Sequence, residues 1–202
     1  MAPLAKAELA PVAEILARAF RDNALNRAVI ASNDPNRRLS SNRYGMFGLL
    51  PIARSFGYVA TAKSGGILSG ALVSSPPNRF PLPPPAWLPR LRCLVGQGWR
   101  VARRWGDVFD ALQQLHPIEP HWYLATLGVD PLQQRRGVGA ALLEAWLAGV
   151  DRSGLRAYLE TDGASNVAFY QRAGFRVVNE TEILGVPVWC MDRPASTEPQ
   201  RY

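Results

Sequence analysis

The sequence is poor in residues that cross-link chains or bind metals. It contains two cysteines, Cys93 and Cys190, and two histidines, His116 and His121, among 202 residues. Two cysteines are too few for a disulfide framework, and the four residues show no metal-ligand spacing. We therefore expect no structural metal.

Long apolar runs are also missing. None approaches the roughly 18 residues of a membrane-spanning helix, and the N-terminal stretch lacks the basic and continuously apolar regions of a secretory signal. With 48% hydrophobic and 19% charged residues, the composition is that of a globular protein. The default expectation is a cytoplasmic protein without a membrane span.

Acidic residues are scarce in the first half of the chain. Residues 1–106 carry 15 basic and 4 acidic side chains, whereas residues 107–202 carry 8 and 12. A basic half can indicate an anionic partner such as nucleic acid, a membrane surface or a phosphorylated cofactor. No nucleic-acid recognition motif accompanies the charge, so we expect no specific nucleic-acid partner.

The first seventy-five residues read as helices followed by a hairpin. An apolar stripe beginning near Leu9 predicts a helix, and helical spacing over 38–56 predicts a second one with a kink at Pro51. Strands at 58–62 and 67–74 flank a Lys-Ser-Gly-Gly turn, which is typical of a hairpin.

The chain then becomes proline-rich. Half of the fourteen residues from Pro76 to Pro89 are proline, which excludes a regular helix or central strand there. A basic amphipathic helix is predicted from about Arg90 to Leu115. Such a helix either lies on a membrane surface or packs on the protein with a solvated basic face, and we favour the packed helix.

The remaining chain alternates strands and helices. Strands are predicted at 121–129, 155–161 and in two late segments, with helices at 137–150 and over the short stretch "SNVAFYQRAG". Ser165 is a plausible N-cap of that short helix, and Gly174 its stop. The order predicts an α/β fold with a mixed sheet.

A glycine-containing turn, "QQRRGVGA", joins the strand at 121–129 to the next helix. The first N–H groups of a helix have no internal partner and carry partial positive charge, so they bind anions. Gly137 and Gly139 lack Cβ atoms, which lets phosphate oxygens approach the main chain. The alternative is a tight turn that needs small residues only for packing. The spacing fits neither a dinucleotide fingerprint nor a P-loop.

Two motifs in this region resemble the GNAT N-acetyltransferase superfamily. Residues 134–140 fit its Q/R-x-x-G-x-G/A loop, and the segment from Asn166 through Tyr170 to "RAGF" fits its second element. From His116 to Asp192 the chain is similar to the puromycin N-acetyltransferase type. The resemblance implies a mixed, mostly antiparallel sheet with splayed central strands and helices on both faces. It also implies acetyl-CoA as co-substrate and no metal.

The resemblance implies the following cofactor-binding residues. Main-chain groups of Leu127, Gly128 and Val129 would contact pantetheine, and the loop Gln134, Arg135, Arg136, Gly137, Val138, Gly139 and Ala140 would hold the pyrophosphate. Asn166, Phe169 and Tyr170 complete the cofactor site. Arg135 stands where family members often have glycine.

Tyr170 is our candidate general acid. The departing thiolate needs a proton, and a phenol can supply it; the alternative is that Tyr170 only packs its helix. A base must also take the proton of the amine, directly or through water. Four residues near strand ends are the candidates: Glu119, His116, His121 and Glu160. Trp87, Trp99 and Trp105 would either line the acceptor pocket or fill the core.

The sequence therefore predicts a single N-acetyltransferase domain over residues 1–193, with the segment 76–118 inserted before the cofactor-binding core and a flexible tail at 194–202. The expected reaction is transfer of an acetyl group from acetyl-CoA to a small-molecule amine. Acetylation of a protein or peptide amine and a non-catalytic acyl-CoA-binding domain are the alternatives. A homodimer is an open alternative to a monomer.

Overall fold

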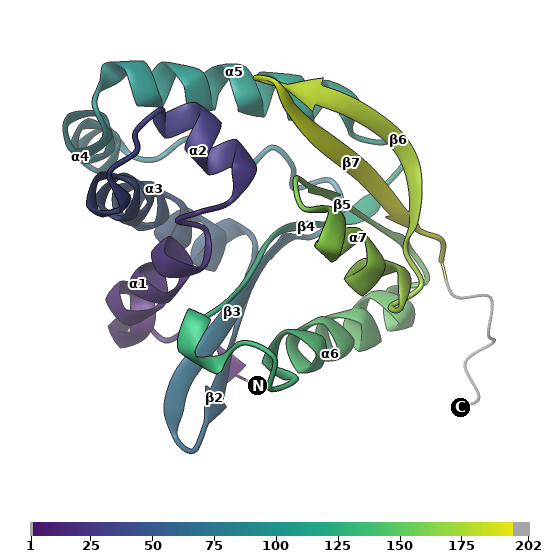
Figure 1. Cartoon of the computed structure of the whole chain (residues 1–202). Helices are drawn as coiled ribbons and strands as arrows, with labels where there is room; N and C mark the ends of the chain where they lie inside the picture. The colour runs from purple at the N-terminus through teal and green to yellow at the C-terminus, as the bar shows by residue number, and fades with distance from the viewer. Residues whose placement is uncertain (1, 196–202) are drawn as a thin grey trace.

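The computed structural model describes residues 2–195, which form one seven-stranded sheet covered by helices on both faces (Figure 1). The elements, in chain order, are β1 (Ala2–Pro3), the 3-10 turn η1 (Lys6–Glu8), α1 (Leu9–Ala19), α2 (Ala24–Ile30), α3 (Pro35–Phe56), β2 (Tyr58–Ser64), β3 (Ile67–Ser75), α4 (Trp87–Gln97), α5 (Trp99–Leu115), β4 (His121–Val129), η2 (Pro131–Gln133), α6 (Val138–Ser153), β5 (Arg156–Thr161), α7 (Ala164–Gln171), β6 (Arg176–Ile183) and β7 (Val186–Arg193).

The strand order is β1-β2-β3-β4-β5-β7-β6. Every neighbouring pair is antiparallel except β4 and β5, which run parallel. The predicted α/β class and the mixed, mostly antiparallel sheet are confirmed.

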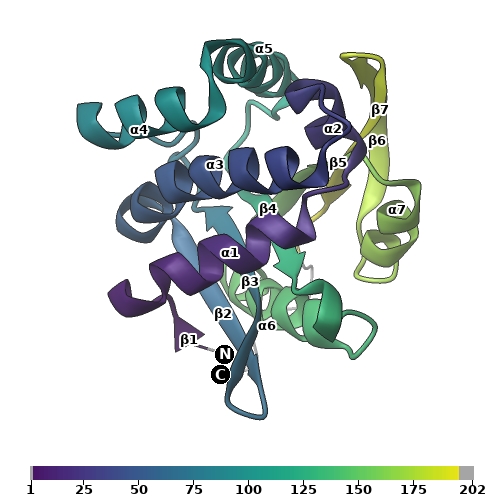
Figure 2. The same cartoon turned by 60° about the vertical axis from the view of Figure 1, so that its left-hand side comes forward.

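Two hydrophobic clusters hold helices to the two faces of the sheet. On one face, Val12 and Leu16 of α1 and Leu50 of α3 pack against Ala71 and Val73 of β3. On the other, α6 and α7 pack against the central strands, with Leu142, Trp146, Leu159, Tyr170 and Phe175 in a single cluster. Figure 2 shows α1 and α3 crossing the front of β2 and β3, with α6 behind.

A third cluster joins the N-terminal helices to the late hairpin. Val29 and Ile30 of α2 and Val101 and Val108 of α5 pack with Ile183 and Val188 of the β6–β7 hairpin. The side chain of Asp162, just after β5, accepts a hydrogen bond from the main-chain N–H of Leu25 at 2.8 Å and so helps to hold the start of α2. These contacts hold α2 against α5, the β6–β7 hairpin and the residue that follows β5.

Several sequence expectations differ from the structure. The predicted helix from Arg90 to Leu115 is two helices, because Gly98 adopts a left-handed φ of 85° between them. The first of them begins at Trp87, so the end of the proline-rich stretch is helical, with Pro89 in the first turn where no helical N–H bond is lost. The N-cap of α7 is Gly163 and not Ser165, which lies in the first turn. α3 continues through Pro51 as one helix. The elements β1 and α2 were not expected. β1 has two residues and α2 has seven, and elements this short carry little periodic signal.

The end of α7 lies close to where the sequence predicts it. Gly174 has a φ of 89°, as expected of a glycine that ends a helix. Of the tail expected at 194–202, residues 196–202 lie outside the described residues. The division into a domain at 1–193 and a tail stays a prediction.

Candidate active site

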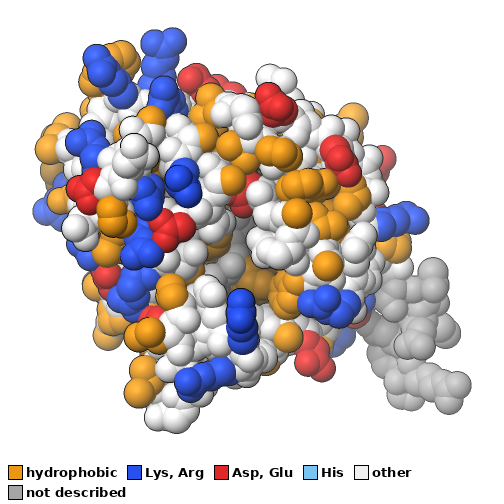
Figure 3. Space-filling model, viewed as in Figure 1, with side chains coloured by type: hydrophobic (Ala, Val, Ile, Leu, Met, Phe, Trp, Pro, Cys, Tyr) orange, Lys and Arg blue, Asp and Glu red, His pale blue; other side chains and the backbone are white. Residues whose placement is uncertain are grey.

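The central strands β4 and β5 pair over a short stretch and then separate. Their parallel register covers three pairs, which are His121 with Arg156, Trp122 with Ala157 and Tyr123 with Tyr158. β4 continues to Val129 paired only with β3, and an extra residue at Ala125 forms a bulge opposite Val73 and Ser74. Bulges bend a strand, so β4 turns away from β5. The predicted splay is present, and Figure 3 shows the surface hollowed at the centre of this face with hydrophobic side chains inside.

The loop after β4 is held in place by Asp130. Its carboxylate accepts a hydrogen bond from the N–H of Leu132 at 3.0 Å and pairs with Arg18 of α1, and its own N–H donates to the carbonyl of Ser69. The side-chain amide of Gln134 donates to the carbonyl of Val129 at 3.2 Å. The loop that opens α6 therefore has a defined path.

The start of α6 has the geometry of an anion site. Gly137 has a φ of 79° and precedes the helix, and its carbonyl accepts the first helical hydrogen bond, from Ala141 at 2.9 Å. The N–H groups of Val138, Gly139 and Ala140 consequently have no partner inside the helix. Arg135 and Arg136 lie exposed beside them. This corner presents free main-chain donors and positive charge to solvent.

Three glycines of the predicted site are there for different reasons. A Cβ on Gly128 would lie 2.5 Å from Leu16 Cδ2 and 3.1 Å from Phe20 Cε2, so packing of α1 requires glycine there. Gly137 needs its positive φ. A Cβ on Gly139 would meet only Val129 Cγ2 at 3.4 Å, an ordinary contact, and Phe169 Cζ at 3.9 Å. The protein itself therefore has room for a methyl group at position 139.

The second motif places α7 beside the end of β5. The side-chain amide of Asn166 donates to Thr161 Oγ1 at 3.2 Å, and Phe169 packs edge-on against Tyr170 with ring centroids 5.1 Å apart. Tyr170 also contacts Phe175, with ring centroids 5.8 Å apart. α7 thus holds Tyr170 in a fixed aromatic setting.

The Tyr170 hydroxyl is held in its protonated form. Burial raises the pKa of Tyr170 above its ordinary value, and the negative charge of Asp162 adds to the rise. The hydroxyl makes no hydrogen bond with the described residues, yet it is not among the fully buried unpaired atoms. The hydroxyl is therefore protonated and able to donate a hydrogen bond to a ligand.

The structure brings together three of the four candidate bases. His116 Nε2 lies 3.2 Å from Glu160 Oε1, with the two side chains only 6% and 5% exposed. His116 Nδ1 lies 3.3 Å from His121 Nε2. The carboxylate of Glu119 is instead 69% exposed and pairs with Arg156. Glu119 is therefore separate from the buried cluster of His116, His121 and Glu160.

The hydrogen-bond pattern determines where the protons of this cluster lie. His121 Nδ1 is 2.8 Å from the carbonyl oxygen of Glu119, which can only accept. Burial lowers the pKa of His121, with the nearby positive charges acting in the same direction, which favours the neutral ring. Neutral His121 then has a bare Nε2, so His116 Nδ1 must donate to it. The other ring nitrogen of His116, Nε2, then faces Glu160.

His116 Nε2 and Glu160 Oε1 are within ion-pair distance but make no hydrogen bond with each other or with another described group. Their contact is attractive only if one of them carries a proton. Buried polar atoms without a hydrogen bond are rare, and each requires an explanation. Two facing acceptor atoms have the capacity to take up one proton between them.

The sequence did not indicate the walls of this cluster. Phe80, from the proline-rich connector, stacks on His116 with ring centroids 3.9 Å apart, and Tyr123 packs edge-on at 4.4 Å. The Tyr158 hydroxyl donates to the carbonyl of Leu115 at 3.1 Å. Burial and the charge of Glu160 raise the pKa of Tyr123 well above its ordinary value. The alternation of residues along β4 could have placed Tyr123 beside His121, but no sequence signal points to Phe80.

Two of the three tryptophans considered for the acceptor pocket lie on the surface. Trp87 and Trp99 are exposed, in α4 and at the start of α5, and Trp105 packs with the cluster of α2 and α5. The expectation that the first two fill the core is wrong, and a role in the acceptor pocket stays a prediction for them.

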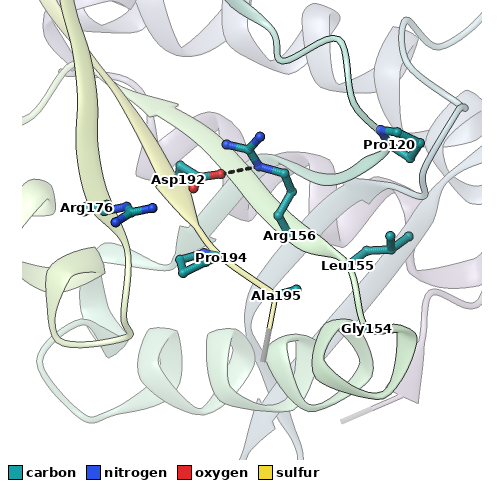
Figure 4. A pocket seen from close by; sticks show the side chains of 8 residues that line it. All are labelled: Pro120, Gly154, Leu155, Arg156, Arg176, Asp192, Pro194 and Ala195. Atoms are coloured by element: carbon teal, nitrogen blue, oxygen red, sulfur yellow. Dashed lines mark hydrogen bonds and ion pairs between the residues drawn. The ribbon is translucent and has the colours of Figure 1, made fainter. Parts of the chain in front are cut away.

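A second depression lies at the opposite ends of the central strands (Figure 4). It is lined by Pro120, the turn before β5, the arginines Arg156 and Arg176, and Asp192, which accepts a hydrogen bond from Arg156 Nε at 2.7 Å. No residue of the predicted cofactor site takes part in it.

Residues 2–195 contain neither a membrane-spanning helix nor a metal-binding cluster. No helix in this part of the chain is long and apolar enough to cross a membrane. The same residues contain no group of three or more His, Cys, Asp or Glu side chains that could hold a metal ion.

The loop geometry leads to a prediction about Arg135. Its φ of 60° is in the left-handed region that favours glycine. Arg135→Gly should raise the free energy of unfolding by roughly 0.5–1 kcal/mol, the strain relieved less the added chain entropy. Arg136→Gly, at a neighbour without positive φ, should lower it by a similar amount. Urea unfolding measures both, and equal losses in the two variants would contradict the strain.

Comparison with known proteins agrees with this architecture. Residues 97–177 match the family model described as the acetyltransferase (GNAT) domain. The matched segment runs from the end of α4 to the start of β6, so it includes β4, the loop before α6, and Tyr170.

Solved acetyltransferases share the fold over nearly the whole chain. A structure from Corynebacterium glutamicum, described as histone acetyltransferase HPA2 and related acetyltransferase, superposes with a TM-score of 0.73 at 22% identity, covering 98% of this chain and 96% of that one. Arylalkylamine N-acetyltransferase 2 from Aedes aegypti gives 0.61 at 14% identity, covering 96% and 98%. The PaiA N-acetyltransferase from Thermoplasma acidophilum, solved with coenzyme A, gives 0.58 at 15% identity, covering 96% of each chain.

Identities this low establish the fold alone, while the family model identifies the segment that carries the loop and Tyr170. The chain therefore has the fold of these acetyltransferases, and its residues 97–177 match the model of the GNAT acetyltransferase domain.

Proposed function

We propose that this acetyltransferase is acetyl-CoA-dependent and transfers the acetyl group to a primary amine of a small molecule. The observation that carries the proposal is the gap between β4 and β5, which opens next to the free N–H groups at the start of α6. A linear thioester with a pyrophosphate at its far end matches this arrangement of gap and anion site. The coenzyme A in the PaiA structure supports the same donor.

The residues of the site fit this co-substrate. The pyrophosphate would lie against the N–H groups of Val138, Gly139 and Ala140, with Gln134, Arg135, Arg136 and Gly137 shaping the loop. The free edge of β4 at Leu127, Gly128 and Val129 would contact pantetheine. Asn166 and Phe169 would border it from α7. Because the protein leaves room for a side chain at Gly139, a close-lying ligand gives a reason for glycine there.

In the proposed reaction the amine nitrogen bonds to the thioester carbonyl carbon and the carbon–sulfur bond breaks. Tyr170 gives its proton to the leaving thiolate, since it is protonated and makes no hydrogen bond within the described protein. The attacking amine loses a proton, so that neutral amine and thioester become amide and thiol. Bulk water then reprotonates the phenolate.

For the proton of the amine we propose Glu160, acting with His116. Glu160 lies two residues beyond Tyr158, the last residue of β5 that pairs with β4, and so at the start of the gap. A proton accepted by Glu160 can pass to His116, 3.2 Å away, and His116 contacts His121. Glu119 is exposed and paired with Arg156, which makes it a weaker candidate.

The closed acceptor side favours a small amine over a protein. α2, α5 and the β6–β7 hairpin pack together in one hydrophobic cluster, and Asp162 ties α2 to the end of β5. A peptide chain needs an open groove, which this packing narrows. The resemblance to puromycin N-acetyltransferases from His116 to Asp192 likewise favours a small, antibiotic-like amine. Thiol release from acetyl-CoA in a panel of amines and peptides, puromycin included, tests the choice.

Our first functional prediction concerns the anion site. Gly139→Val should weaken acetyl-CoA binding at least about tenfold, because displacing the pyrophosphate loses charge-assisted hydrogen bonds worth roughly 1.5–3 kcal/mol each. Gly149→Val, in the same helix with only Arg152 Nη2 within 4 Å of an added Cβ, is the matched control and should bind normally. Calorimetry measures both affinities, and equal values would disprove the pyrophosphate site.

The second prediction concerns the general acid. Tyr170→Phe should lower kcat by roughly 10²–10⁴-fold with little change in acetyl-CoA affinity. Stability should not fall, because the hydroxyl makes no hydrogen bond within the described protein. Tyr58→Phe, at an exposed position of β2, serves as the control. If Tyr170→Phe turns over at the wild-type rate while chemistry is rate-limiting, another group protonates the sulfur.

The third prediction separates the candidate bases. Glu160→Gln keeps the side-chain volume but removes the proton acceptor, so kcat/KM at neutral pH should fall by about 10²-fold. The loss should shrink as pH rises, because the amine then arrives deprotonated. Glu119→Gln should retain the wild-type rate. Steady-state pH profiles of both variants decide the matter, and the opposite pattern would make Glu119 the base.

A further inference from the structure

Helix α4 contributes no buried residue to the protein. Its apolar side chains face outward, with Trp87 72%, Leu88 49%, Leu91 49% and Val95 75% exposed. Positions 88, 91 and 95 share one face of a helix by their spacing, and Trp87 adjoins it. We call these four residues the α4 patch.

The opposite face of α4 attaches it to the protein. Cys93 Sγ donates a hydrogen bond to the carbonyl of Tyr44 in α3 at 3.0 Å. A Cβ on Gly96 would lie 2.4 Å from the Tyr44 ring, and one on Gly48 2.7 Å from Cys93 Sγ, so small residues allow the helices to approach closely. α4 is therefore docked on α3 through one face while the α4 patch points away. Figure 2 shows α4 projecting at the edge of the molecule beside α3.

The α4 patch lies in a basic stretch of the chain. The chain has no acidic residue from 35 to 106, a stretch with eleven lysines and arginines. Arg90 and Arg92 lie on the two sides of the patch by helical geometry, and both are exposed. Arg100 and Arg103 follow in α5, and none of these four arginines makes an ion pair with another described residue. Figure 3 shows hydrophobic and basic side chains together at the upper left, over α4 and α5, with fewer acidic ones among them.

We propose that the α4 patch and its arginines dock the protein on an anionic lipid surface. An interfacial helix buries an apolar face at the level of the headgroups while basic residues contact lipid phosphates. Tryptophan is enriched at that depth, and Trp87 with Trp99, 61% exposed at the junction of α4 and α5, supplies two. The outward, convex position of the helix suits a flat surface.

Two other partners fit the observations less well. In a symmetric dimer through this face, the same patch meets itself, so the arginines of both copies would face like charge. Nucleic acid would pair with the arginines but leave Leu88, Leu91 and Val95 in water. Anionic lipid satisfies both the charge and the apolar surface.

The lipid site is independent of the proposed catalytic function. In Figure 3 the hollow between β4 and β5 opens toward the viewer, while α4 lies at the left edge. Docking through α4 therefore leaves the hollow accessible, and acetyl-CoA binding should be the same with and without vesicles. Loss of one activity by mutation does not predict loss of the other.

The test is co-sedimentation of the full chain with vesicles, using phosphatidylcholine alone or mixed in equal parts with phosphatidylglycerol. The wild type should pellet with the mixed vesicles, pellet poorly with phosphatidylcholine, and be released at about 0.5 M NaCl, where charges are strongly screened. Leu91→Glu combined with Val95→Glu should reduce binding more than about tenfold. Ile67→Glu, which changes an exposed apolar residue in the β2–β3 hairpin, is the matched control and should bind like the wild type.

A second pair of variants tests the charge. Arg90→Ala with Arg92→Ala should weaken binding about fivefold per arginine, while Arg176→Ala, on exposed β6, should leave it unchanged. Unaltered acetyl-CoA affinity and thermal unfolding establish that each variant is folded. The proposal is overturned if the wild type does not bind mixed vesicles, or if Leu91→Glu with Val95→Glu binds them equally well. It is also overturned if the wild type is a dimer that this double variant dissociates, or if duplex DNA is bound in place of vesicles.

Discussion

The short parallel contact between β4 and β5 determines the rest of the site. The two strands share three residue pairs and then part beyond Tyr123 and Tyr158, with a bulge at Ala125 bending β4 toward β3. A longer contact would have filled the centre of the sheet with paired main chain. Because the strands separate, one edge of β4 becomes available to a ligand. Its end lies next to the start of α6, where a Cβ on Gly139 would be 3.4 Å from Val129 Cγ2.

The two ends of this gap provide different chemistry. The outer end has main-chain donors at the start of α6 and a strained loop around Arg135, which suits an anion. The inner end has a buried carboxylate and two imidazoles, one of which faces Glu160 without a hydrogen bond. Tyr170 stands beside the gap as a protonated phenol. In the function that we propose, the outer end would hold the donor co-substrate and the inner end would carry the proton away from the amine.

Ion pairs within the protein account for only some of the arginines in the basic first half of the chain. Arg38 pairs with Asp22, Arg43 with Glu14, and Arg18 with Asp130, so these arginines connect the N-terminal helices to one another and to the loop after β4. The arginines of α4 have no such partner among the described residues and surround an exposed apolar face. This separates internal from surface charge, a distinction that net charge alone does not make.

The sequence by itself determined the local structure of the loop before α6 and of α7. The glycines before α6, the helix that follows and the segment carrying Tyr170 are read from neighbouring residues, because a helix N-terminus and its loop are local structures. Gly128 illustrates the limit, since its need for glycine comes from Leu16 and Phe20 of a distant helix. Only the tertiary structure brought His116, His121 and Glu160 together, stacked Phe80 on them and turned the apolar face of α4 outward. These features depend on contacts between segments far apart in the chain, which local periodicity does not encode.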